Sequence, residues 1–214
     1  MQADDDTPEV TTGRRRSPAR AQMVRSAATL IREHGIHGVG LREVVAHSGG
    51  PRGSLGRYFP GGKTQLMTEA IDVVIAELSA EVDERIAKAK TFPDAIVAIV
   101  APWRRLLVEY DFALGCPIAA TVVDAADNDA LRGHVDELLA QTQASIADVC
   151  ARFGAPPSAA EEQATVLLAA IEGALILARA RRSIEPLDTV ERYFATRPPA
   201  ALQPGRQPQS MPST

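Results

Sequence analysis

Apolar residues recur at the spacing of an amphipathic helix along most of the chain, and no segment alternates in the way typical of a strand. In the first helical segment Ala27, Leu30 and Ile31 fall on one face, and Gly35 follows at the position where glycine ends helices. Glycine and proline separate the later segments. The pattern predicts an all-α fold, with helices over residues 19–34, 41–48, 52–59, 63–90, 92–111, 115–126, 129–153, 158–182 and 187–196.

The composition adds limits to this picture. The chain has 214 residues, of which 45% are hydrophobic and 23% are charged. This composition is sufficient for a buried hydrophobic core. Cys116 and Cys150 form neither a metal-binding spacing nor a disulfide framework, which indicates a reduced protein. The first 18 residues hold no secretion signal, and the most apolar stretch, residues 164–178, is shorter than the roughly 18 residues that span a bilayer. We therefore expect a cytoplasmic protein with no membrane partner.

The charge is divided unevenly along the chain. The net charge is −4, but residues 14–63 hold ten basic side chains against two acidic ones, a balance of +8. Residues 64–214 hold 13 basic and 21 acidic side chains, a balance of −8. A basic N-terminal segment followed by an acidic remainder indicates that only the N-terminal segment binds a polyanion. The three arginines at 14–16 fit either an arm in the DNA minor groove or a solvated basic tail.

The stretch GGPRGSLGRYFPGGK, residues 49–63, allows two interpretations. With Thr64 it ends in Gly-Lys-Thr, as a phosphate-binding P-loop does, but the first glycine of that motif would fall at residue 57, which is arginine. The segment before it also has the pattern of an amphipathic helix rather than of a buried strand. The alternative is a helix-turn-helix, in which the helices at 41–48 and 52–59 are separated by a glycine-containing turn. This second interpretation fits more of the sequence.

In a helix-turn-helix the second helix enters the major groove of DNA. Small residues at its start let the backbone approach the DNA, and arginines reach base edges or phosphates. A lysine at the start of the next helix suits a further phosphate. Leu55 and Phe59 are expected to anchor the second helix to the core. The candidate DNA-binding residues are Arg42, Arg52, Gly53, Ser54, Arg57, Tyr58 and Lys63.

Residues 27–66, AATLIREHGIHGVGLREVVAHSGGPRGSLGRYFPGGKTQL, resemble the DNA-binding region of the tetracycline-repressor (TetR) family. The segments GGPRGSL and FPGGKTQL, together with Gly115-Cys116-Pro117-Ile118-Ala119 further on, are similar to the LmrA/YxaF-like subgroup of that family. The resemblance implies a homodimeric repressor that a small molecule releases from a palindromic operator.

One position departs from the family pattern. The family usually has a tyrosine after the leucine of the recognition helix, where it contacts a phosphate, but this chain has Gly56. The position that is often histidine is Tyr58, and glycine costs a helix about 1 kcal/mol relative to alanine. Either Tyr58 or Arg57 replaces the lost contact, or Gly56 lowers the affinity for DNA. The alternative function is therefore a small-molecule-binding helical protein with a degenerate DNA-binding head.

The later helices are expected to bind the effector and a second subunit. The stretch at residues 164–178 is apolar on nearly every side of the helix. Such a helix must bury every side, so one face should meet its own core and another face a second copy of the chain. The candidate dimer-interface residues are Leu138, Ile146, Leu167, Ile171, Ala174, Leu175 and Ala178. Residues that either line a cavity for a small hydrophobic or aromatic effector or simply pack in the core are Trp103, Leu107, Tyr110, Phe112, Cys116, Ile118 and Val122.

No arrangement of Ser, His and Asp or of paired carboxylates indicates an enzyme, and His34, His37 and His47 lack the further ligands that a metal needs. We expect no catalytic residue, metal or cofactor. The predicted domains are a disordered basic arm (1–18), a helix-turn-helix DNA-binding domain (19–62), a ligand-binding and dimerisation domain (63–197) and a flexible tail (198–214).

Overall fold

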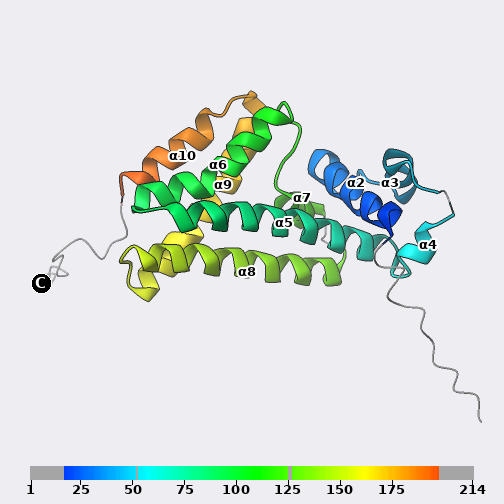
Figure 1. The fold of residues 1–214 in the computed structure, drawn as a ribbon, viewed down its shortest axis with the longest axis horizontal. Helices are drawn as coiled ribbons and strands as arrows, with labels where there is room; N and C mark the ends of the chain where they lie inside the picture. The colour runs from blue at the N-terminus through cyan, green and yellow to red at the C-terminus, as the bar shows by residue number, and fades with distance from the viewer. Residues whose placement is uncertain (1–16, 52, 125–126, 198–214) are drawn as a thin grey trace, which may run out of the picture. The chain divides into compact units, whose positions relative to one another are not determined.

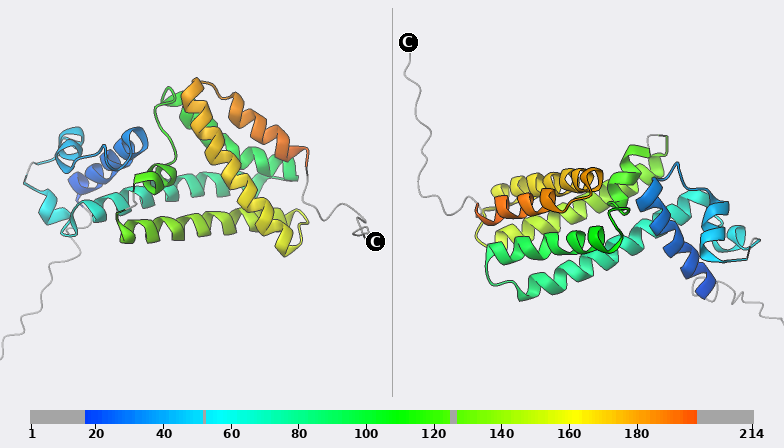
Figure 2. Two further views of the ribbon diagram at one scale, coloured as in Figure 1. Left: turned by 180° about the vertical axis from the view of Figure 1, so that it is seen from behind. Right: turned by 90° about the horizontal axis from the view of Figure 1, so that it is seen from above.

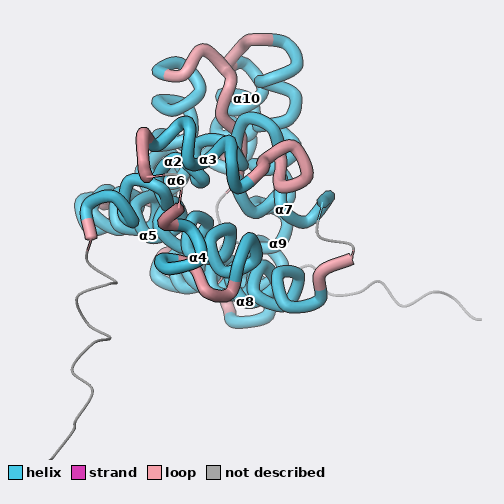
Figure 3. Tube along the Cα trace, turned by 90° about the vertical axis from the view of Figure 1, so that its right-hand side faces the viewer, coloured by secondary structure: helices cyan, strands magenta, loops and turns pink. Residues whose placement is uncertain are grey.

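The computed structural model describes residues 17–51, 53–124 and 127–197, and within these ranges it contains helices and loops but no strand (Figures 1 and 3). The all-α prediction is confirmed. The helices are α2 (Pro18–His34), α3 (Leu41–Ser48), α4 (Leu55–Tyr58), α5 (Gly62–Lys88), α6 (Phe92–Glu109), α7 (Pro117–Asp124), α8 (Asp129–Arg152), α9 (Pro157–Arg181) and α10 (Glu185–Ala195).

The helix predicted over 52–59 is shorter in the structure, where α4 begins only at Leu55. The carbonyl of Pro51 accepts hydrogen bonds from both the backbone N–H of Ser54, at 3.1 Å, and its hydroxyl, at 2.6 Å. These bonds extend the turn to Ser54. They occupy the carbonyl of Pro51, which would accept the first hydrogen bond of a helix that began at residue 52. The turn between α3 and α4 is therefore longer than the glycine pair alone predicts.

The start of α9 also differs from the prediction. The sequence Ser158-Ala159-Ala160-Glu161 has the pattern of a capping box, but the helix begins one residue earlier, at Pro157. Its N-cap is Pro156, which has no side chain to accept a hydrogen bond. Proline at the first helical position needs no partner for a backbone N–H, and this explains why the helix can begin there.

The chain divides into two compact units. The first contains the chain up to Ala80 together with Ala113–Glu137, and the second contains Glu81–Phe112 and the chain from Leu138 onward. In the first unit α2 packs against α3 and α7, and in the second α6, α9 and α10 pack against one another (Figure 2). The boundary at 62/63 predicted from the sequence divides the chain by function and stays a prediction.

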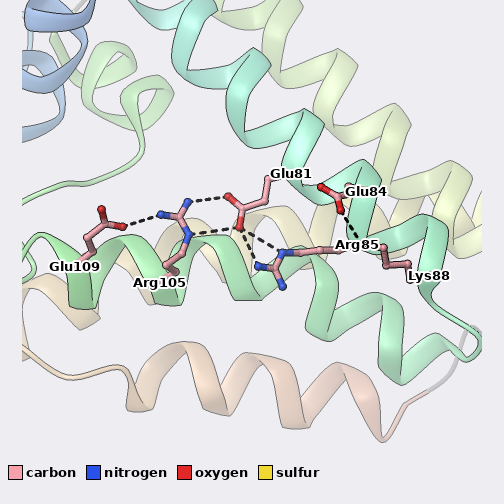
Figure 4. Close-up of polar contacts among 6 residues, drawn as sticks. All are labelled: Glu81, Glu84, Arg85, Lys88, Arg105 and Glu109. Carbon is pink, nitrogen blue, oxygen red and sulfur yellow. Dashed lines mark hydrogen bonds and ion pairs between the residues drawn. The ribbon is translucent and has the colours of Figure 1, made fainter.

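Ion pairs join the helices of the second unit. Arg104 of α6 binds two carboxylates of α10, Asp188 at 2.8 Å and Glu191 at 2.7 Å. Glu81 of α5 accepts hydrogen bonds from Arg105 of α6, with a shortest distance of 2.7 Å, and from Arg85 (Figure 4). The hydrogen bond from Arg105 is the main cause that lowers the pKa of Glu81. Glu81 therefore stays ionised at neutral pH and connects α5 to α6.

Cys116 and Cys150 are both buried and are not joined by a disulfide. Burial raises the pKa of the Cys150 thiol to about 11, which keeps it protonated and unreactive at neutral pH. Both observations fit the expectation from the sequence that neither cysteine belongs to a disulfide framework.

Helix α9 is longer than the apolar stretch from which the sequence prediction excluded a membrane span. Its 25 residues are long and apolar enough to cross a bilayer, and 33% of its most apolar 18-residue window is buried. Length and composition do not distinguish a membrane span from the core helix of a water-soluble protein. The face of α9 that packs on α6 and α10 accounts for part of its apolar character.

Candidate nucleic-acid interface

Two glycines shape the turn after α3, each for a different reason. Gly49 has a φ of +64°, in the left-handed region that glycine adopts most easily. At Gly50 an added Cβ would collide with the side chain of Met23 in α2. The turn therefore favours glycine at 49 for its backbone conformation, and a side chain at 50 would require the terminal methyl of Met23 to move, which fits the close turn expected for a helix-turn-helix.

Phe59 and Arg20 anchor the C-terminal end of helix α4. The ring of Phe59 is 2% exposed, and the guanidinium of Arg20 lies 4.7 Å from its centroid. Arg20 also donates to the carbonyl of Tyr58 at 3.3 Å and to the carboxylate of Glu69 in α5 at 2.6 Å. The expectation that Phe59 anchors the recognition helix is confirmed, and α2 and α5 supply the partners that hold it.

The outer surface of α4 and of the turn before it carries small residues and an arginine. Gly53, Gly56 and Arg57 are exposed, and so is Arg42 on α3. Arg52 lies outside the described residues. The exposed glycines leave the backbone accessible beside a positive charge, and both backbone N–H groups and arginines can contact a DNA phosphate.

Two of the predicted DNA-binding side chains are directed elsewhere. Ser54 is 4% exposed, because its hydroxyl donates to the carbonyl of Pro51. Lys63 is half-buried, and its ammonium donates to the carbonyl of Ile36 at 2.7 Å. The hydroxyl and the ammonium therefore have structural partners within the chain.

Tyr58 connects the start of α2 with Arg57. Its hydroxyl lies 3.1 Å from the Oγ of Ser17 and accepts a hydrogen bond from the Nη2 of Arg57 at 3.2 Å. The guanidinium of Arg57 also lies 5.0 Å from the centroid of the Tyr58 ring. The hydrogen bond with Ser17 and then the one from Arg57 lower the pKa of Tyr58. The sequence pattern did not single out Ser17, since the residue is 41 positions away from Tyr58.

Nothing around Gly56 requires a glycine. A Cβ added there would meet no atom within 4 Å, and its φ is not among the positive values found at other glycines of the chain. The glycine therefore serves no packing purpose in the free chain. It leaves the surface of α4 open at the position where the family pattern has a tyrosine.

The residues predicted to line an effector cavity are divided between the two units. Trp103, Leu107, Tyr110 and Phe112 belong to the second unit. Cys116, Ile118 and Val122 belong to the first. Leu107, Cys116 and Ile118 are buried, Trp103 and Phe112 are half-buried, and Tyr110 and Val122 are exposed. Their grouping into one cavity stays a prediction.

A charged groove lies in the second unit, between the end of α5 and the start of α6. It has a volume of about 580 Å³. Its lining residues are Glu81, Glu84, Arg85, Lys88, Ala89, Asp94, Val97 and Ala98. Ion pairs join Glu84 to Lys88 at 2.7 Å and Glu81 to Arg85 at 3.1 Å, so the charges largely neutralise one another (Figure 4). This groove does not have the apolar lining predicted for the effector.

The seven residues predicted for the dimer interface are all buried inside a single chain, the most exposed being Leu138 at 9%. The opposite face of α9 is exposed. Val166, Ile176 and Leu177 are 51%, 64% and 44% exposed, and Gly173 between them has open space around it. Their spacing places them on one stripe, which we call the α9 outer stripe. The prediction of a helix–helix interface stays a prediction, and this stripe is the surface of α9 that is available for it.

Comparison with known proteins agrees with this geometry. Residues 24–70 match the model of the tetR family of bacterial regulatory proteins, and residues 93–193 match the C-terminal domain of LmrA/YxaF-like transcriptional regulators. An uncharacterised HTH-type transcriptional regulator of Mycobacterium tuberculosis is 41% identical over 182 residues, covering 82% of this chain and 91% of the relative. The HTH-type transcriptional regulator LmrA of Bacillus subtilis is 27% identical over 174 residues, covering 79% of this chain and 90% of the relative.

Solved structures share the fold. The regulatory protein TetR from Rhodobacter sphaeroides matches with a TM-score of 0.74 at 19% identity, covering 84% of this chain and 98% of its own. A TetR transcriptional regulator from Chloroflexus aurantiacus matches with a TM-score of 0.68 at 27% identity, covering 83% of this chain and 92% of its own. The helix-turn-helix with its basic outer surface, the matched domains and these relatives agree, and the chain belongs to the TetR family of transcriptional regulators, which are not enzymes, with an LmrA/YxaF-like C-terminal domain.

Proposed function

We propose that the protein is a homodimeric, cytoplasmic repressor that binds a palindromic operator through α3 and α4 and leaves it when a small hydrophobic effector binds. The observation that carries the proposal is the exposed surface of Gly53, Gly56 and Arg57, held on a rigid base by Phe59 and Arg20. A recognition helix reads DNA reproducibly only if its own position is fixed. The predicted domains, with the head at 19–62 and the effector and dimer domain at 63–197, are part of this proposal.

A second copy of the chain is expected to pack on the α9 outer stripe. Val166, Gly173 and Ile176 combine apolar area with a small residue at which another helix can approach closely. The neighbouring helix α8 is held beside α9 by a hydrogen bond of 2.8 Å from Gln143 to Thr165, and it exposes Ala140 and Ala144. Two such helices from each copy would form a four-helix interface.

The effector is proposed to be hydrophobic or aromatic because the cavity residues predicted on α6 and just after it, Trp103, Leu107 and Phe112, are large and apolar. Trp103 and Phe112 are half-buried, and Leu107, which lies between them in the sequence, is buried. Binding of a ligand lowers operator affinity only if the DNA-bound form has less affinity for that ligand, so the coupling must be reciprocal. An effector found by thermal stabilisation is therefore expected to bind more weakly when operator DNA is present.

The proposal is tested by selecting duplexes from a randomised DNA library with the wild-type protein. We expect one short palindrome to be enriched, with binding that falls steeply as salt rises. Enrichment of no sequence, combined with weak binding to every duplex, would instead support the alternative of a degenerate DNA-binding head on a small-molecule-binding protein.

The role of Arg57 and Tyr58 can be tested on the selected duplex. Arg57→Ala is expected to weaken binding by about tenfold and to reduce the salt slope by about 1, because one phosphate contact is lost. Tyr58→Phe keeps the ring under the guanidinium but loses the hydroxyl, so we expect a weakening of about threefold with an unchanged slope. Arg192→Ala removes the same charge from an exposed site on α10, in the second unit, and serves as the control. Wild-type affinity in both variants would mean that Gly56 simply lowers the affinity for DNA.

A further inference from the structure

One peptide group in the turn after α2 is held from two sides. The carbonyl of Ile36 accepts a hydrogen bond from the Nζ of Lys63 at 2.7 Å. The backbone N–H of His37 donates to the Oδ2 of Asp124 at 3.1 Å. This carbonyl and this N–H belong to the same peptide bond. Lys63 lies at the start of α5 and Asp124 at the end of α7, so two helices from distant parts of the sequence hold one peptide of the helix-turn-helix by opposite charges.

The position of Asp124 has an electrostatic cost. It is the last residue of α7 and lies beside Gly35, the C-cap of α2, so a negative charge stands at the negative ends of two helix dipoles. The N–H of His37 compensates for part of this cost. Gly35 has a φ of +73°, and an added Cβ would collide with the carboxylate of Asp124. The local backbone therefore leaves room for an acid where helix electrostatics disfavour one.

The residues just before α7 are also hydrogen-bonded to α2. Arg32 donates from its Nε to the carbonyl of Gly115 at 2.9 Å, and the N–H of Gly115 donates to the carbonyl of Arg32 at 3.2 Å. Arg32 is 7% exposed, so this pairing is shielded from water. Residues just before α7 and at its end are thus both bonded to the last turn of α2 and the residues that follow it. A displacement of α7 against α5 must act on the Ile36–His37 peptide.

We propose that Lys63 and Asp124 form a clamp on the Ile36–His37 peptide and act as positioning residues for operator binding. The clamp fixes the helix-turn-helix between α5 and α7, so a shift of either helix changes the orientation of α3 and α4. The proposal rests on the proposed function, because it presumes an operator whose half-sites the two heads must match. Half-sites lie about one helical turn, or 34 Å, apart, and a small change of orientation therefore lowers specific affinity. The clamp assigns the Lys63 ammonium and the Asp124 carboxylate to this peptide rather than to the DNA.

Asp124→Ala gives a result whose sign is diagnostic. Removing a negative charge from a DNA-binding protein should strengthen its attraction to DNA if long-range electrostatics alone act. The clamp predicts the opposite, a weakening of about tenfold on the selected duplex, because a hydrogen bond to a charged group is lost. Asp136→Ala removes an exposed acid of the same charge from α8 and is expected to bind as tightly as wild type or more tightly. Asp124→Asn keeps an acceptor and is expected to stay within about threefold of wild type.

Lys63→Met separates the clamp from a direct phosphate contact. A lysine that contacts phosphate contributes about 1 to the salt slope, whereas a clamp lysine leaves the slope unchanged while the specific affinity falls. Binding to a duplex of random sequence is measured beside the selected one. The clamp predicts a loss on the selected duplex only, whereas a destabilised fold lowers the active fraction on both.

Direct evidence for the contact comes from amide hydrogen exchange. The N–H of His37 is expected to exchange faster in Asp124→Ala than in Asp136→Ala, and the amides within α5 should exchange at the wild-type rate. Wild-type affinity and unchanged His37 exchange in Asp124→Ala would overturn the clamp while leaving the proposed function intact. Failure of the wild type to select any duplex would overturn the proposed function, and the His37 exchange would still test the contact itself.

Discussion

Ile176→Glu is expected to convert the dimer into monomers and to weaken operator binding by more than about 100-fold. Ile176 lies on the α9 outer stripe with 64% of its side chain exposed in one chain, so the substitution creates no buried charge within the chain. In the proposed dimer the same position would be covered by a second copy, and a carboxylate there would have no partner. A monomer binds only one half-site and loses the advantage of joint binding, which is worth about 100-fold or more. Sedimentation equilibrium and binding to the selected duplex measure the two effects.

Two further variants make this prediction specific to the stripe. Tyr193→Glu on α10 places the same charge on another exposed side chain, 50% exposed, and should leave the mass and the affinity unchanged. Leu167→Ala changes a fully buried residue of the opposite face of α9. It is expected to destabilise the fold by about 2–5 kcal/mol rather than to dissociate the dimer directly. A dimeric Ile176→Glu protein with normal helix content would show that the copies meet elsewhere.

The two faces of α9 show which feature of the fold the sequence could not predict, namely the face that packs inside the chain. The spacing of apolar residues placed the helix correctly, because a long apolar run at helical period has no other stable arrangement. It could not say which apolar face meets α6 and α10, since both faces are apolar. Leu167 and Ile171, which were predicted at the interface, are 0% and 2% exposed inside one chain, and their place in an interface stays a prediction. Only the packing of helices distant in sequence decides between two faces of equal hydrophobicity.

The recognition site shows the same limit at the level of single side chains. The basic, glycine-rich stretch predicted the helix-turn-helix, its glycine turn and the burial of Phe59, because these depend on local pattern and backbone conformation. The direction of Lys63 depends on Ile36, which is 27 residues away, and the role of Tyr58 depends on Ser17, which is 41 residues away. A lysine at a helix start suits a phosphate in general, but here a nearer carbonyl takes the ammonium. Tertiary contacts of this kind leave no periodic signal in a sequence.

Phe59→Ala is expected to lower the free energy of unfolding by about 3–5 kcal/mol, the typical effect of deleting a buried aromatic side chain. The ring is 2% exposed and lies under the guanidinium of Arg20, so its removal leaves a cavity beside a charge that has lost its aromatic partner. Helix α4 has only four residues and is far too short to be helical alone. Its order therefore depends on this anchor, and the loss should also extend to specific DNA binding.

Phe59→Leu and Tyr193→Ala separate the anchor from general aromatic content. Leucine keeps most of the buried volume and should cost less than about 1.5 kcal/mol, whereas Tyr193 is exposed and its truncation should change stability by no more than about 0.5 kcal/mol. Urea unfolding at one fixed protein concentration measures all three variants, because the proposed dimerisation would make the apparent stability depend on concentration. Loss of less than about 1 kcal/mol in Phe59→Ala would mean that the hydrogen bond from Arg20 to the carbonyl of Tyr58 holds α4 without the ring.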